Sequence, residues 1–133
     1  MAADARIVVA ADTDIVAARQ EGRRIAATLR FSDSDLACIA AAISEVSRNI
    51  VTYAGRGEVC VSVVERAGRR GVLIVARDAG PGIADVALAL QDGYSTSGSL
   101  GLGLPGARRL MDEFEVQSDD GKGTVVTMRK WLR

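Results

Sequence analysis

Two glycine clusters, Asp-Ala-Gly-Pro-Gly at 78–82 and Gly-Leu-Gly-Leu-Pro-Gly at 101–106, most constrain what this chain can fold into. Glycine adopts backbone conformations closed to other residues and lets the main chain approach a ligand closely. The second cluster leads into an apolar segment with helical spacing at 104–111, and the N–H groups at the start of a helix favour phosphate. We therefore interpret 78–106 as a nucleotide pocket with a lid.

The composition excludes several functional classes. The 133 residues suit a single domain, 1–133, with a packed core, and 48% of them are apolar. Seventeen basic and seventeen acidic residues cancel, so we expect no nucleic acid and no membrane surface as a partner. Histidine is absent, which removes histidine triads, histidine metal ligands and phosphohistidine chemistry. Residues 1–11 lack the apolar core of a signal peptide, so we expect a cytoplasmic protein.

Hydrophobic periodicity predicts the elements. Period-two runs predict strands at 6–10, 58–66, 72–76, 114–118 and 124–131. Helical spacing predicts helices within 12–29, 36–54, 83–90 and 104–111. Asp12 or Thr13 can cap the first helix, and turns are expected at 67–71 and 119–123. This order predicts an α+β fold, a two-layer sandwich with helices on one face of a mixed, mostly antiparallel sheet.

Glu45 and Asn49 are the first candidate site residues. They lie four positions apart on the longest predicted helix, so they share one face. A solvated helix edge would explain them equally well. In a functional interpretation, Asn49 offers Mg²⁺ a neutral oxygen ligand, and Glu45 takes a proton from an attacking hydroxyl or water.

Asp78 ends a predicted hairpin and begins the first glycine cluster. An ordinary turn is one interpretation. In the other, the Asp78 carboxylate accepts a hydrogen bond from the exocyclic amine of adenine, and Gly80 and Gly82 let the chain turn under the base. Thr124 follows a predicted hairpin turn and could supply a hydroxyl near the same base.

The second cluster, 101–106, formally matches the dinucleotide fingerprint G-x-G-x-x-G, with Asp119 and Asp120 at a suitable distance downstream. That fingerprint requires a strand immediately before it, whereas 93–99 is a polar loop, so a dinucleotide-binding fold is disfavoured. The phosphate-binding sequence G-x-x-x-x-G-K-[S/T] is absent as well. A tight structural loop remains the alternative to a phosphate site.

Taken in order, these motifs resemble the GHKL ATPase and kinase superfamily with its Bergerat nucleotide-binding fold. A Glu-x-x-x-Asn helix comes first, then a hairpin ending in Asp-x-Gly-x-Gly, a loop with Gly-Leu-Gly-Leu, and Gly-x-Gly-Thr. The segments 43–50, 93–97 and 101–114 look like the RsbT-type switch kinases of bacterial stressosomes. The related anti-sigma kinases of the RsbW and SpoIIAB type carry Ala after the Asn and a His soon afterwards. Here Ile50 follows Asn49 and there is no His, which favours the RsbT type.

The resemblance implies a Mg-ATP-dependent protein serine/threonine kinase. By it, Asn49 holds Mg²⁺, Glu45 is the base for a Ser or Thr hydroxyl, and Asp78 binds adenine with support from Thr124. Glycines shape the pocket floor, namely Gly80 and Gly82. Backbone N–H groups at the start of the last helix hold the phosphates, with Gly101, Leu102, Gly103 and Leu104 as the expected residues. The ATP lid is expected at residues 85–100.

The implied partners are STAS-domain antagonist and scaffold proteins, together with a PP2C-type phosphatase that the released kinase would activate. An arginine of the same chain could assist the transfer, and Arg48 is the nearest in sequence to the proposed base. Two other functions stay open. One is an anti-sigma factor that acts by binding a sigma factor, and the other is a nucleotide-dependent interaction module without catalysis.

Overall fold

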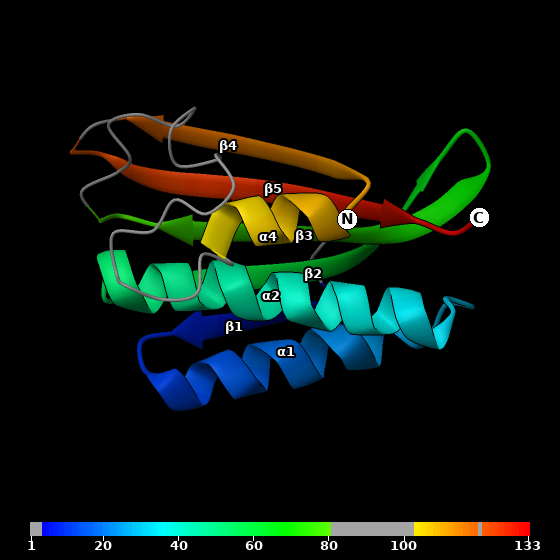
Figure 1. The fold of residues 1–133 in the computed structure, drawn as a ribbon, viewed down its shortest axis with the longest axis horizontal. Helices are drawn as coiled ribbons and strands as arrows, with labels where there is room; N and C mark the ends of the chain where they lie inside the picture. Colours follow the sequence, from blue (N-terminus) through cyan, green and yellow to red (C-terminus); the bar gives the residue numbers. More distant parts are fainter. Residues whose placement is uncertain (1–3, 81–102, 120) are drawn as a thin grey trace.

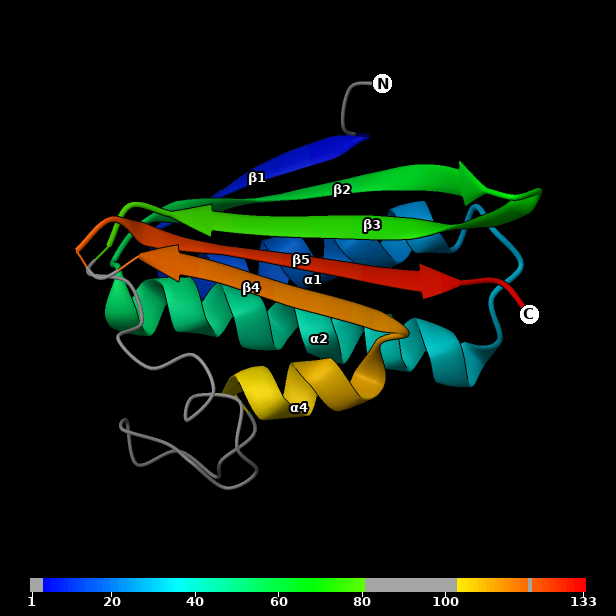
Figure 2. The same ribbon diagram turned by 90° about the horizontal axis from the view of Figure 1, so that it is seen from above.

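The computed structural model describes residues 4–80, 103–119 and 121–133, and within these ranges the chain forms two layers (Figure 1). One layer is a five-stranded sheet in the order β1-β2-β3-β5-β4. Its strands are β1 (Ala5–Val9), β2 (Gly57–Arg66), β3 (Arg69–Asp78), β4 (Glu113–Asp119) and β5 (Gly123–Trp131). The other layer contains the helices α1 (Asp12–Ala26), α2 (Asp33–Tyr53) and α4 (Gly103–Leu110). In the view from above, all three helices lie on the same side of the sheet (Figure 2).

This arrangement confirms the predicted α+β class, with helices on one face of a sheet. The sheet was expected to be mixed, but each of its described strand pairs is antiparallel. The reason is visible in the connections, because β2–β3 and β4–β5 are hairpins and β3 lies antiparallel to β5. The helix predicted at 83–90 and the lid predicted at 85–100 lie outside the described residues.

The first helix begins differently from the prediction. Asp12 and Thr13 were expected to cap it, but α1 already starts at Asp12 and Ala11 is the N-cap residue. The Asp14 carboxylate takes over the capping, since it accepts the N–H groups of Ala10 at 2.9 Å and Ala11 at 3.1 Å. A carboxylate in the first turn also suits the positive end of the helix dipole.

The central helix α2 is held at its start by Ser32, whose Oγ accepts the Asp35 N–H at 3.1 Å. Its apolar stripe turns inward, with Ile39, Ile43, Val46 and Ile50 at most 2% exposed. Gly22 of α1 allows the two helices to approach, because a Cβ there would lie 2.2 Å from Ile43 Cδ1. On its other side α2 packs against α4, so α2 is the middle helix of the layer (Figure 2).

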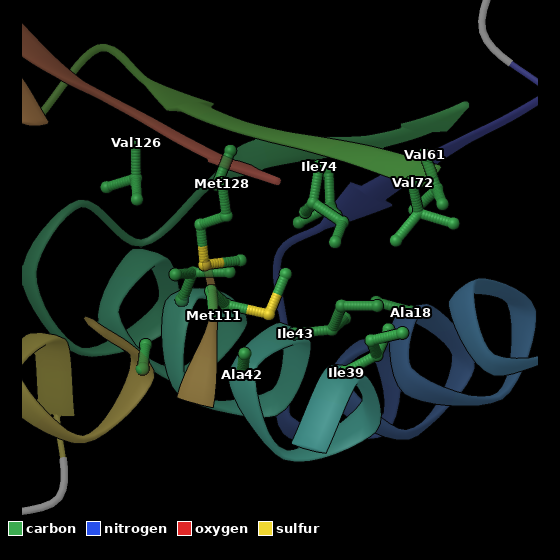
Figure 3. Packing of buried hydrophobic residues seen from close by; sticks show 14 of the residues in the cluster. Ala18, Ile39, Ala42, Ile43, Val61, Val72, Ile74, Met111, Val126 and Met128 are labelled. Atoms are coloured by element: carbon green, nitrogen blue, oxygen red, sulfur yellow. The ribbon is translucent and has the colours of Figure 1, made fainter. Parts of the chain in front are cut away.

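The core fills the space between α2 and the sheet. Figure 3 shows Val61, Val72 and Ile74 from the strands facing Ile39 and Ile43 of the helix. Met111 and Met128 meet at the side where α4 joins the layer (Figure 3). Among the helices described, none is long and apolar enough to cross a lipid bilayer.

The β2–β3 turn is shorter than predicted. Ala67 and Gly68 both have left-handed backbone angles, with φ of 53° and 80°, which close a two-residue hairpin. The strand β3 therefore starts at Arg69 rather than Val72, and Arg69 pairs directly with Arg66. The run of arginines hid this part of the strand, because charged residues do not signal a strand by their hydrophobicity.

Candidate functional site

The motif residues come together at one end of the sandwich. Asp78 is the last residue of β3, and its register neighbours are Gly57 at the start of β2 and Thr124 near the start of β5. The same end of the molecule carries the second half of α2 and faces the start of α4 (Figure 1). Segments far apart in the sequence thus contribute to one site.

Asp78 is half-buried, and its Oδ1 accepts the Gly80 N–H at 2.9 Å. Within the described residues Oδ2 has no hydrogen-bond partner. Because an ionised carboxylate only accepts hydrogen bonds, this oxygen suits a donor such as an amine.

Glycines surround Asp78 where no Cβ would fit. A Cβ at Gly80 would lie 2.6 Å from Ala54 Cβ at the end of α2, and one at Gly123 would lie 2.2 Å from the Asp78 carbonyl oxygen. A Cβ at Gly57 would lie 2.3 Å from the Arg77 carbonyl and 3.1 Å from Asp78 Cβ. The glycines therefore allow the backbone segments around Asp78 to pack closely against one another. Gly82, which was expected to share this role, lies outside the described residues.

Thr124 is 5% exposed, on the helix-facing side of β5, and its hydroxyl lies 2.9 Å from Ser118 Oγ. Ser118 also donates to the Gly123 carbonyl at 3.0 Å. Sequence reasoning missed Ser118, although the hairpin register that pairs it with Thr124 was an available signal. The two hydroxyls form a polar pair, and Thr124 lies directly opposite Asp78 in the register of β5 and β3.

Glu45 and Asn49 lie one turn apart on α2, as predicted. Both are partly buried, and the Glu45 side chain is only 13% exposed, which does not match a freely solvated helix edge. The Arg48 guanidinium donates to Glu45 Oε1 at 2.7 Å. Among the described residues the Asn49 amide has no hydrogen-bond partner. Its oxygen is therefore available for a ligand or a hard cation.

The start of α4 supplies free backbone N–H groups, as every helix start does. Gly103 opens the helix, and Leu104 anchors it with 4% exposure against the core. At the other end of α4, Lys130 Nζ donates to the Leu110 carbonyl at 2.8 Å and lies 3.8 Å from an oxygen of Asp35. Gly101 and Leu102, predicted with Gly103 and Leu104 as phosphate ligands, lie outside the described residues.

Within the described ranges no group of three or more Asp, Glu or Cys side chains could hold a metal ion by itself. A cation at this site would therefore share its coordination between few protein oxygens and a ligand. Mg²⁺ tolerates this arrangement, because it keeps several waters and is commonly bound through substrate phosphates.

Comparison with known proteins identifies the fold and its family. The family model of the histidine kinase-like ATPase domain matches residues 8–130. The chain belongs to this family. RsbT of Bacillus subtilis (strain 168), a serine/threonine-protein kinase, is 52% identical over 120 residues, which are 90% of each chain. Within the histidine kinase-like ATPase family, the chain is therefore a serine/threonine-protein kinase of the RsbT type.

Two further proteins are similar to this chain at lower identity. An anti-sigma F factor of Thermoanaerobacter sp. (strain X514) is 30% identical over 112 residues, which are 80% of this chain and 78% of the relative. The mycobacterial sensor histidine kinase MprB has a similar structure, with a TM-score of 0.60 over 97% of each chain. At 19% sequence identity this last similarity concerns the fold alone.

Proposed function

We propose that this RsbT-type protein uses Mg-ATP to phosphorylate a serine or threonine of a STAS-domain partner. The observation that carries the proposal is that α2, which bears Glu45 and Asn49, packs against both α4 and β3, the strand that ends in Asp78. The 52% identity to a named serine/threonine kinase supports the same reaction.

In this proposal Asp78 selects the nucleotide. Its free carboxylate oxygen accepts the exocyclic amine of adenine, and the hydroxyl of Thr124 supports the contact from the neighbouring strand. Gly80 forms part of the pocket floor in this proposal, and its missing side chain lets the chain after Asp78 pack against Ala54 at the end of α2. A nucleobase without that amine leaves the carboxylate unpaired, which costs about 1–3 kcal/mol.

Asn49 and the start of α4 hold the phosphates and the metal. The Asn49 amide oxygen would be a ligand for Mg²⁺, and the backbone N–H groups of Gly103 and Leu104 would donate to phosphate oxygens. Bound Mg-ATP supplies the phosphoryl group and the neutralising cation. Phosphoryl transfer needs positioning and charge neutralisation more than covalent chemistry, which fits so small a set of residues.

Glu45 acts as the general base. The hydroxyl oxygen of the substrate forms the new bond to phosphorus, its proton passes to the Glu45 carboxylate, and ADP leaves. Glu45 lies one turn from Asn49 on the same helix face, so the base and the metal ligand are held in a fixed relation.

The proposed partners are STAS-domain antagonist and scaffold proteins of a stressosome. Their phosphorylation releases this kinase, which then activates a PP2C-type phosphatase in the cytoplasm. Support for these partners comes from similarity to RsbT. A second candidate, an anti-sigma factor, is favoured by the 30% identity to the anti-sigma F factor of Thermoanaerobacter. Pull-down with a sigma factor and with a STAS protein separates the two functions.

The decisive experiment is transfer of labelled phosphate from Mg-ATP to a cognate STAS protein. We expect the wild type to transfer and Asn49→Ala to lose transfer, because the metal ligand is gone. Thr52→Ala, an exposed change on the same helix, is the matched control and should keep full activity. A stable complex with the STAS protein but no transfer by the wild type would instead support a non-catalytic binding module.

A further inference from the structure

The pair formed by Arg48 and Glu45 points to a role for an arginine that the proposed function leaves unassigned. Arg48 stands directly before the proposed metal ligand Asn49, and its NH1 donates to Glu45 Oε1 at 2.7 Å. We propose that Arg48 is a positioning residue for the transfer, which holds the Glu45 carboxylate ready to accept the substrate proton. This inference rests on the proposed function, because it assumes that Glu45 is the base.

The geometry suits this role. Among the residues that the structure describes, Arg48 contacts Oε1 alone and no group occupies Oε2, which leaves Oε2 for the hydroxyl of the substrate. Glutamate has several rotatable side-chain bonds, and an unrestrained carboxylate would sample many positions relative to a bound substrate. Fixing one oxygen removes much of that freedom before the reaction, and small errors in the placement of a catalytic group are costly.

A second arginine–glutamate pair differs from this one in the exposure of its carboxylate. Arg24 and Glu21 on α1 have the same spacing and the same kind of contact, but the Glu21 side chain is 40% exposed. The Glu45 side chain is 13% exposed, whereas its partner Arg48 is 50% exposed. A carboxylate so withdrawn from water depends on its hydrogen-bond donor, while the exposed Glu21 can exchange its donor for water.

The test compares variants of the two arginines in single-turnover phosphate transfer to the STAS protein. Arg48→Ala should lower the transfer rate by roughly 10- to 100-fold, because the base loses its fixed position. Arg48→Lys should recover part of that rate, since an ammonium can still donate to Oε1. Arg24→Ala is the matched control and should transfer at the wild-type rate. The Kd for ATP and the urea midpoint should be the same in Arg48→Ala and Arg24→Ala.

A double-mutant comparison shows whether Arg48 acts through Glu45. In a Glu45→Gln background, adding Arg48→Ala should change the residual rate by less than about twofold, because the group that Arg48 positions is already gone. The same 10- to 100-fold loss in both backgrounds would overturn the inference, and so would an Arg48→Ala variant as fast as the wild type. A wild type without transfer would overturn the proposed function and this inference together. An active wild type with an unaffected Arg48→Ala overturns this inference alone.

Discussion

Gly123 shows at the scale of one residue how the site limits the sequence. Its φ is +94°, and an added Cβ would lie 2.2 Å from the Asp78 carbonyl oxygen. Gly121, two residues earlier, has a similar φ of +79° but nothing within 4 Å of the position of a Cβ. The two glycines therefore separate the cost of an unusual backbone angle from the cost of a close contact.

We predict that Gly123→Ala lowers the free energy of unfolding by roughly 2–4 kcal/mol, because strain and a steric clash add together. Gly121→Ala should cost only about 1 kcal/mol, from the backbone angle alone. Urea denaturation of both variants measures the difference. Equal losses would show that the contact with Asp78 does not constrain position 123.

At this scale the motifs predicted where the candidate residues lie in the fold better than which atoms they contact. Glu45, Asn49, Asp78 and Thr124 could be named from spacing and order, because helix and hairpin periodicities decide which residues share a face. The bond from Arg48 to Glu45 could not be predicted, since it depends on side-chain rotamers. The hydroxyl pair of Ser118 and Thr124 could have been found, because the predicted turn at 119–123 places these two residues opposite each other.

Among the elements, α4 depends on a buried lysine. The Lys130 side chain is 7% exposed, and its Nζ donates to Leu110, the last residue of α4, while lying within 4.0 Å of carboxylates of Asp35 and Asp112. A cation at the C-terminal end of a helix satisfies orphan carbonyls and complements the dipole. Lys130 thus joins α4 to the start of α2 and to β5.

We predict that Lys130→Met lowers the free energy of unfolding by about 1–3 kcal/mol, because the Leu110 carbonyl loses its donor while the apolar stem is kept. Lys122→Met is the matched control, since Lys122 is exposed in the β4–β5 turn, and it should change stability little. Thermal denaturation at neutral pH compares the two. An equally stable Lys130→Met would show that the packing of the stem, not the ammonium, holds α4 in place.

Glu113, on the edge strand β4, is the centre of a cluster with Trp131 and Arg66. Glu113 accepts the Trp131 Nε1–H at 2.7 Å and an N–H of Arg66 at 2.6 Å, and Arg66 lies 4.7 Å from the centre of the Trp131 ring. The hydrogen bond from Trp131, then that from Arg66, lowers the pKa of Glu113 below its ordinary value of 4.5. The carboxylate form is therefore favoured in the folded chain.

A lowered folded-state pKa means that Glu113 stabilises the protein above the unfolded pKa, and that this contribution is lost as the pH falls through the folded pKa. We predict that Glu113→Gln is less stable than the wild type at pH 7, and that the difference shrinks below about pH 4. Urea midpoints measured from pH 7 to pH 3 test this. A constant difference across that range would exclude ionisation of Glu113 as its cause.

The long helices and strands could be predicted because their apolar residues repeat with a clear period, and the burial of the same residues stabilises them. The ends of these elements could not be predicted in this way. The stripe of α2 repeats over many turns, so its period is clear, and its burial confirms it. The start of β3 was missed because three residues, Arg69 to Gly71, carry no apolar signal although each has a partner on β2. The cap of α1 comes from Asp14 inside the helix, a contact that the order of residues does not distinguish from a cap at Asp12.

For the whole molecule, the site depends on the packing of α2 between α1 and α4. Glu45 and Asn49 belong to the same helix whose stripe fills the core, and Asp78 belongs to the strand that pairs with both β2 and β5 (Figures 1 and 2). A ligand that contacts α2, β3 and α4 together therefore binds the folded state and not the unfolded chain. Such a ligand must raise the stability of the entire domain.

We predict that Mg-ATP raises the melting temperature, and that the gain in stability grows with the logarithm of the ratio of its concentration to its Kd. At a concentration of 100 times the Kd the expected gain is about 2.7 kcal/mol, which for a domain of this size is a shift of roughly 10 °C. Asp78→Asn should lose most of the shift, because its amide can present a donor where adenine also donates. Asp33→Asn is the control and should keep the shift, since Asp33 is exposed at the start of α2. Differential scanning fluorimetry measures the shift with ATP, with GTP and with ATP plus a chelator. The comparison with GTP tests recognition of the base, and the chelator tests the contribution of the metal. A full shift in Asp78→Asn, or an equal shift with GTP, would show that Asp78 does not recognise the nucleotide. A shift that survives chelation would show that the nucleotide binds without the metal.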